Sequence, residues 1–202
     1  MRKSIIAILM TFCLSIMTYA QTPRDRATEL KEQAQSSLNQ KDYIKARYLF
    51  KKAYEAFATR ENYPQAIESG VQANALYVRE NFYKEGFELC RDMDQLIWAG
   101  EQNQKKVFYD LRFLVNKERL QMYTALKNPA QAKTQLNKLE ETANLAKNDS
   151  LTEVLLYTKA NYYYTFNQNT QGDACFRKLI NQYKEKKDYA KVSDCYKNLI
   201  GI

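Results

Sequence analysis

Small and larger apolar residues recur along the chain at a spacing that places them on one face of a helix. In four segments, a small residue is followed by a larger apolar residue four positions later and by another apolar residue seven positions later. The small residues, 40, 46 and 40 positions apart, are Ala46, Gly86, Ala132 and Gly172. The residues that follow them are Phe50, Cys90, Leu136 and Phe176, and then Ala53, Met93, Leu139 and Leu179.

This period predicts an all-α fold: a right-handed α-solenoid of antiparallel helix pairs, each burying its apolar stripe against its neighbours. With only five glycines and three prolines, and no stretch of period-two alternation, the chain suits helices joined by short turns. We expect repeats at about 24–60, 61–101, 102–147 and 148–186, and a partial repeat at 187–202. The expected helices span about 28–39, 44–59, 64–80, 84–98, 104–126, 130–147, 151–167 and 171–184.

Several local features refine this expectation. Asn148-Asp149-Ser150 supplies an N-cap signal, and Glu153, three residues after Ser150, completes a capping box. Trp98, near the end of its helix, is expected to pack beneath the following turn. Cys90 lies on an apolar stripe and is expected in the core, whereas the sequence leaves open whether Cys175 and Cys195 pair.

The first twenty residues have the pattern of a signal peptide. Arg2 and Lys3 precede an apolar stretch at 4–17, and Thr18-Tyr19-Ala20 supplies a small-x-small cleavage site. We therefore expect residues 1–20 to be removed from an exported protein, periplasmic in a Gram-negative source, with an uncleaved anchor as the alternative. Residues 21–202 then form the helical repeat domain.

Composition narrows the chemistry. The formal net charge of +8 falls to +6 without Arg2 and Lys3, and no dense basic block suggests nucleic-acid binding. Because the chain has no histidine, the commonest general base and the usual zinc ligand are missing. No glycine-rich phosphate loop occurs either. We expect no enzyme activity, catalytic residue, metal or cofactor.

The expected helices also carry a second set of recurring residues. The first helix of each pair has Ala34, Asn74, Leu120 or Ala160 at one position, and Ser37, Tyr77, Tyr123 or Tyr163 three positions later. Together with turns such as Lys41-Asp42-Tyr43, these residues resemble the tetratricopeptide-repeat family. The period is longer than usual, the family's first-helix Trp and Gly are absent, and Leu120 replaces the small residue in the third repeat. The resemblance implies a tetratricopeptide-like scaffold, and the leader adds a resemblance to sensor segments of bacterial signalling proteins.

In such a solenoid the first helices line the concave face, where a ligand is expected to bind. Cations, amides and tyrosines there suit an extended peptide. Tyr157 and Tyr164, seven residues apart, share one face, either as a ligand platform or as filling against the fifth helix. Some tetratricopeptide domains bind a C-terminal carboxylate with a Lys-Asn-Asn-Lys-Arg set in the groove. In this chain only Lys31 matches that set, so binding of a C-terminal carboxylate is not expected. The candidate binding residues are Lys31, Gln35, Arg79, Lys117, Gln121, Tyr157, Asn161 and Tyr164.

These features predict a non-catalytic scaffold that binds a protein or peptide segment outside the cytoplasm, with no nucleic-acid partner. We expect it to be the extracytoplasmic input region of a signalling protein. The chain stops at Ile202 midway through a first helix, so we expect either a longer protein, with a membrane segment beyond residue 202, or a partner that covers the last helix. The alternatives are a stand-alone periplasmic scaffold for envelope assembly and a carbohydrate- or small-molecule-binding solenoid.

Overall fold

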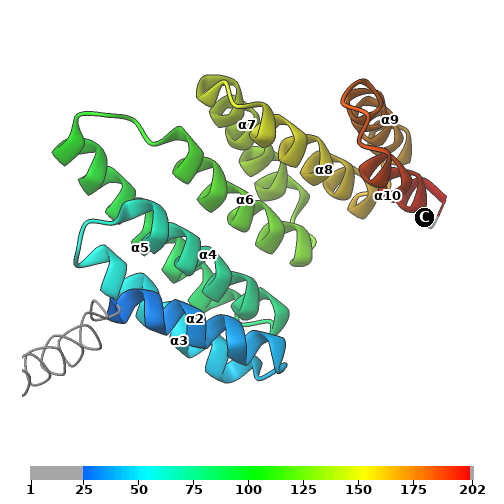
Figure 1. Cartoon of the computed structure of the whole chain (residues 1–202). Helices are drawn as coiled ribbons and strands as arrows, with labels where there is room; N and C mark the ends of the chain where they lie inside the picture. Colours follow the sequence, from blue (N-terminus) through cyan, green and yellow to red (C-terminus); the bar gives the residue numbers. More distant parts are fainter. Residues whose placement is uncertain (1–24, 201–202) are drawn as a thin grey trace, which may run out of the picture.

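The structure, a computed structural model, describes residues 25–200, which form nine helices and no strand (Figure 1). The predicted all-α class is therefore confirmed for this part of the chain. The proposed signal peptide at 1–20 and the chain end at Ile202 lie outside the described residues. The helices are α2 (Arg26–Asn39), α3 (Tyr43–Ala58), α4 (Tyr63–Arg79), α5 (Tyr83–Gln104), α6 (Tyr109–Ala125), α7 (Pro129–Ala146), α8 (Asp149–Thr165), α9 (Asn169–Glu185) and α10 (Tyr189–Ile200).

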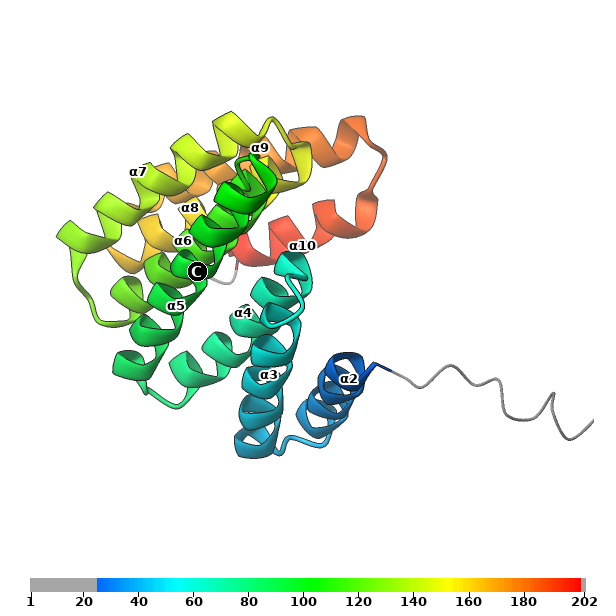
Figure 2. The same cartoon turned by 90° about the vertical axis from the view of Figure 1, so that its left-hand side faces the viewer.

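The helices follow one another as a row of packed neighbours, as expected for an α-solenoid. Each helix packs against the next along the chain, and α4 and α8 also pack against α6. Figure 2 shows that the row curves, so that α2 and α10 lie on the same side of α5–α7 in that view. The buried side chains form three clusters along the row, and Tyr163 of α8 packs against two of them.

All eight connections between these helices use the same backbone device. Each contains a residue in the left-handed region, with φ between 50° and 63°, and none of the eight is glycine. In the α2–α3 turn the N–H of Asp42 donates to the carbonyl of Ser37, which is the hydrogen bond of a Schellman motif. The side chain of Asp42 then accepts from the N–H of Lys45 and caps the next helix. The left-handed residues are Lys41, Glu61, Asn81, Lys105, Lys127, Lys147, Asn167 and Lys187.

The predicted packing face is confirmed by burial. All twelve residues of the recurring small-and-apolar pattern are buried, as are the four first-helix positions that include Asn74 and Leu120. Two of the small residues permit close approach. A Cβ atom on Gly86 would lie 2.8 Å from Sδ of Met122, and one on Gly172 would lie 2.8 Å from the ring of Tyr164. At Gly86 and Gly172 the neighbouring helix therefore leaves no room for a larger side chain.

The boundaries of α5 and α6 correct the prediction. Helix α5 runs on to Gln104 instead of ending near Trp98, and α6 begins at Tyr109. Trp98 does not pack beneath a turn: 62% of its surface is exposed. The other helices begin and end within two residues of the predicted positions.

A buried carboxylate fixes the α5–α6 connection. Oε1 of Glu101 accepts from the N–H of Phe108 at 2.9 Å and from Nε of Arg112 at 2.7 Å, and Oε2 accepts from Nη2 of Arg112. The guanidinium of Arg112 and the N–H of Phe108 lower the pKa of Glu101 below its ordinary value. Glu101 therefore acts as a staple between the end of α5 and the start of α6.

The three cysteines in the described part of the chain are buried free thiols. Cys90 is fully buried in the core, as predicted, and burial raises its pKa to about 12. Cys175 and Cys195 belong to the cluster between α8, α9 and α10 without a bond between them.

Gly172→Ala tests the close approach of α8 and α9. Because Tyr164 is held by a hydrogen bond to Asp173 and by stacking on Phe176, its ring cannot move freely away from a new methyl group. We expect a loss of about 1–3 kcal/mol in the free energy of unfolding, measured by urea denaturation. Helix propensity alone predicts the opposite sign, a gain of about 0.5–1 kcal/mol. A stabilised variant would contradict the packing, and Tyr164→Leu in the same chain should remove the penalty.

Glu101→Gln tests the staple. We expect a loss of about 1–3 kcal/mol at pH 7, because the charge-assisted hydrogen bonds to Arg112 are weakened. Since the pKa of Glu101 is lowered by folding, its contribution is complete above the unfolded pKa of about 4.3 and is lost as the pH falls through the folded value. The stability difference between the two proteins should therefore shrink below about pH 4. A difference that is independent of pH between 7 and 3 would show that the charge of Glu101 is not involved.

Candidate functional site

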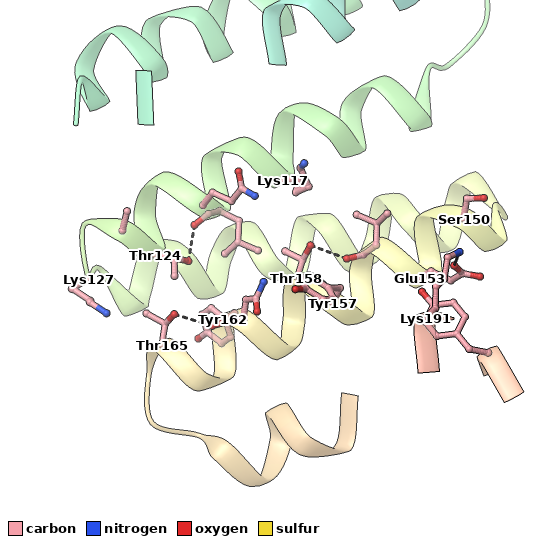
Figure 3. Close-up of a pocket in the computed structure, with 16 residues that line it drawn as sticks. Lys117, Thr124, Lys127, Ser150, Glu153, Tyr157, Thr158, Tyr162, Thr165 and Lys191 are labelled. Atoms are coloured by element: carbon pink, nitrogen blue, oxygen red, sulfur yellow. Dashed lines mark hydrogen bonds and ion pairs between the residues drawn. The ribbon is translucent and has the colours of Figure 1, made fainter. Parts of the chain in front are cut away.

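A groove with a volume of about 740 Å³ lies between α6 and α8, two first helices of the predicted pairs. Figure 3 shows Lys117 and Thr124 of α6 facing Tyr157, Thr158 and Thr165 of α8. Tyr183 of α9 and Lys191 of α10 close one end. The lining residues of this α6–α8 groove are Lys117, Leu120, Gln121, Thr124, Ala125, Lys127, Ser150, Glu153, Val154, Tyr157, Thr158, Asn161, Tyr162, Thr165, Tyr183 and Lys191.

The structure brings four of the eight predicted residues together in this groove. Lys117 and Gln121 come from α6, and Tyr157 and Asn161 come from α8. Gln121 and Asn161 are exposed, and among residues 25–200 neither side-chain amide has a hydrogen-bond partner. Tyr157 is 44% exposed, and its ring meets the edge of Phe176 at a centroid distance of 5.5 Å. The groove thus combines an aromatic surface with two free amides.

Sequence reasoning missed most of the remaining lining residues. Val154, Thr158 and Thr165 lie three before, one after and eight after Tyr157, so helical spacing from that residue could have found them. The threonine hydroxyls add few free donors, because those of Thr124, Thr158 and Thr165 donate to carbonyls of their own helices at 2.7–2.8 Å. Around these threonines the lining is therefore polar but offers few free hydroxyl donors.

The sequence predicted that Glu153 completes a capping box with Ser150, and this prediction is wrong. The cap of α8 is Asn148, whose side chain accepts from the N–H of Ser150 at 3.0 Å. Glu153 instead accepts from Nζ of Lys186, lies 3.6 Å from Nζ of Lys191 and bonds the hydroxyl of Tyr183. Lys186, foremost among these partners, lowers the pKa of Glu153. Glu153 therefore ties α8 to the α9–α10 end of the molecule.

Lys117 borders a buried polar network at the other side of α6. Its Nζ lies 3.3 Å from Oε1 of Glu118, which is 1% exposed and also accepts from Nδ2 of Asn74 at 3.1 Å. Asn74 occupies the first-helix position that holds alanine in α2 and α8. The network joins α4 to α6 and holds the ammonium of Lys117, which is also a lining residue of the groove.

Three predicted residues lie outside the α6–α8 groove. Lys31 joins α2 to α4 through Gln65 at 2.9 Å and Glu68 at 2.7 Å. Gln35 is exposed and donates to Asn39 of its own helix at 3.1 Å. Arg79 stacks over the ring of Tyr43 at 3.9 Å. These polar side chains are engaged in contacts between or within helices of the first two pairs.

Tyr164 also lies outside the groove lining. It stacks on Phe176 at 6.0 Å, covers Gly172, and donates its hydroxyl to Asp173 at 2.7 Å. Burial, followed by the hydrogen bond to Asp173, raises the pKa of Tyr164. Tyr157 and Tyr164 do share a helix face, since both contact Phe176, but only Tyr157 reaches the groove.

Comparisons with known proteins add no assignment: no family model, no curated protein and no solved structure matches the chain. Within residues 25–200, no helix has the length and apolar character needed to cross a membrane. The same residues contain no group of three or more cysteine, aspartate or glutamate side chains placed to hold a metal ion.

The different environments of the two tyrosines can be tested with a matched pair of substitutions. Tyr164→Phe removes the hydroxyl that donates to Asp173, so we expect a loss of about 0.5–1.5 kcal/mol in the free energy of unfolding. Tyr157→Phe removes a hydroxyl with no partner among the described residues and should change stability by less than about 0.5 kcal/mol. Urea denaturation of both variants measures the difference, and equal losses would contradict these assignments.

Proposed function

We propose that this chain is a non-catalytic, tetratricopeptide-like scaffold that binds a peptide or protein segment in the α6–α8 groove. In this proposal the helices form a right-handed solenoid of about four and a half repeats. The observation that carries the proposal is the groove itself, in which two free amides, Gln121 and Asn161, flank the exposed ring of Tyr157. Free amides can bond the backbone of an extended chain, and an exposed aromatic ring offers contact area for its side chains.

The proposed setting is outside the cytoplasm. The signal-peptide pattern of residues 1–20 supports export, and the periplasm is the corresponding compartment in a Gram-negative source. We propose that the domain is the input region of a signalling protein with a membrane segment beyond residue 202. A stand-alone scaffold for envelope assembly is the alternative setting, and it would use the same groove.

Carbohydrate binding is the second candidate, and one observation favours it. Tyr157 presents an exposed ring beside the amide of Asn161 and the hydroxyl of Thr158, a combination that can stack on and bond a sugar. The second platform expected for this function, Tyr164, is packed over Gly172 and is not a lining residue. Peptide binding is therefore the stronger candidate, because it needs only the one ring and the amides.

The test is selection of binders from a random peptide display library against residues 21–202. We expect binding of the selected peptides to weaken about tenfold or more in the double variant Gln121→Ala/Asn161→Ala, since each lost hydrogen bond costs about 1 kcal/mol. The matched control is Gln131→Ala/Asn137→Ala, which removes the same two residue types from exposed positions on α7. Hydrogen exchange should show protection in α6 and α8. Selected peptides that bind both double variants equally would refute the groove as the binding site.

A further inference from the structure

Charge in the α6–α8 groove indicates what kind of peptide it takes. Among the sixteen lining residues, three are lysines and one is a carboxylate, Glu153. Glu153 is already engaged by Lys186, Lys191 and Tyr183, so it does not repel or recruit a ligand as a free carboxylate would. Lys191 is engaged by Glu153 and Lys117 by Glu118, whereas Lys127 has no carboxylate partner within residues 25–200. The uncompensated charge along the groove is therefore positive and comes from Lys127, and Lys117 contributes an ammonium that it shares with Glu118.

The two lysines differ in how they are held. Lys127 is exposed at the left-handed position after α6, and no carboxylate partners it within residues 25–200 (Figure 3). Lys117 is 3.3 Å from the buried carboxylate of Glu118, which occupies one of the three N–H donors of its ammonium. The other two N–H donors have no hydrogen-bond partner within residues 25–200, so Lys117 can share its ammonium with a second carboxylate.

Their separation sets a spacing. From Lys117 to the end of α6 at Ala125 the helix rises about 12 Å, and Lys127 lies two residues beyond that end. An extended chain advances about 3.3 Å per residue, so the distance corresponds to about four or five peptide residues. Across the groove from α6, helix α8 offers Val154 and Tyr157, which are 41% and 44% exposed. These side chains suit an apolar residue of the ligand.

Resting on the proposed function, we propose that the groove selects an extended, internal peptide segment with two acidic side chains four or five residues apart and an apolar residue between them. One carboxylate pairs with Lys127 and the other with Lys117. The amides of Gln121 and Asn161 bond the peptide backbone, and the apolar residue lies against Tyr157 and Val154. Recognition depends on side-chain carboxylates and needs no peptide terminus.

The experiment uses pools of fluorescent nonapeptides, acetylated and amidated so that they carry no terminal charge. One pool has Glu at positions 3 and 7 with Leu at position 5, and the other positions vary among uncharged residues. A matched pool has Gln at positions 3 and 7, and a third has Lys there. We expect residues 21–202 to bind the Glu pool about five- to tenfold more tightly than the Gln pool at about 50 mM salt, and the advantage to shrink as salt rises.

Substitutions assign the effect to the lysines. Lys127→Gln should reduce the advantage of the Glu pool about threefold. Lys133→Gln, at an exposed position on α7, is the matched control and should leave it unchanged. Lys117→Gln should act like Lys127→Gln, with circular dichroism confirming the fold because Glu118 loses a partner. In a fourth pool, one of the two glutamates is replaced by lysine. Lys127→Glu should bind this pool more tightly than the Glu pool.

The outcomes separate this inference from the proposed function. If the Glu and Gln pools bind equally and Gln121→Ala/Asn161→Ala weakens both, the groove binds peptides and the acidic selection is wrong. If the Glu pool is favoured equally by Lys127→Gln and Lys133→Gln, the charge acts elsewhere and the inference is also wrong. If no pool binds better than it does to Gln121→Ala/Asn161→Ala, both the inference and the proposed function are overturned.

Discussion

The left-handed residue in each connection is the constraint on which the rest of this structure depends. A helix ends when one residue adopts positive φ, and the hydrogen bonds of the Schellman motif then turn the chain back along the helix that it has just left. A left-handed residue occurs at every connection between residues 25 and 200, and each helix packs against its predecessor. Asparagine tolerates this conformation, and the five lysines at such positions complement the negative end of the helix dipole. Glycine is thus not required for the turns.

The spacing of these residues also explains the irregular repeat. Successive left-handed residues are 20 positions apart except around α5 and α6, where Lys105 comes 24 after Asn81 and Lys127 comes 22 after Lys105. Four of the six additional residues of the 46-residue interval therefore fall between Asn81 and Lys105, the stretch that holds α5, and two fall between Lys105 and Lys127. Helix α5 is longer than the other helices of residues 25–200. In its last turn Glu101 accepts a hydrogen bond from Arg112 of α6, and Trp98, one turn earlier, is exposed. In this part of the row a change in length has been absorbed without loss of the packing face, since Gly86 and Ala132 are both buried.

The sequence could predict which residues are buried, because burial follows the local helical period. It could not predict which polar side chains pair, because their partners lie far away in the sequence. The buried stripe was predicted because small and apolar residues repeat at helical spacing, and the four residues that meet in the groove followed from the same spacing. The local pattern predicts a capping box between Ser150 and Glu153, whereas the partners of Glu153 lie thirty or more residues away and Asn148 is the cap. Lys31 and Arg79 were predicted on the open face for the same reason: Glu68 and Tyr43, which engage them, lie on neighbouring helices.

This difference between engaged and free polar groups is what distinguishes the groove from the rest of the first-helix surface. In the first two pairs, the polar side chains of α2 and α4 bond one another or stack on rings. Between α6 and α8 they do not: Leu120 stands where the other first helices carry a small residue or Asn74, and α10 is drawn toward α8 through Glu153 and Lys191. The larger residue forms a floor, the ion pair closes one end, and the amides of Gln121 and Asn161 are left without partners between them. Because an exposed amide loses little by exchanging water for a ligand, while an engaged one must first break a bond, a ligand is expected to bind at this point of the row.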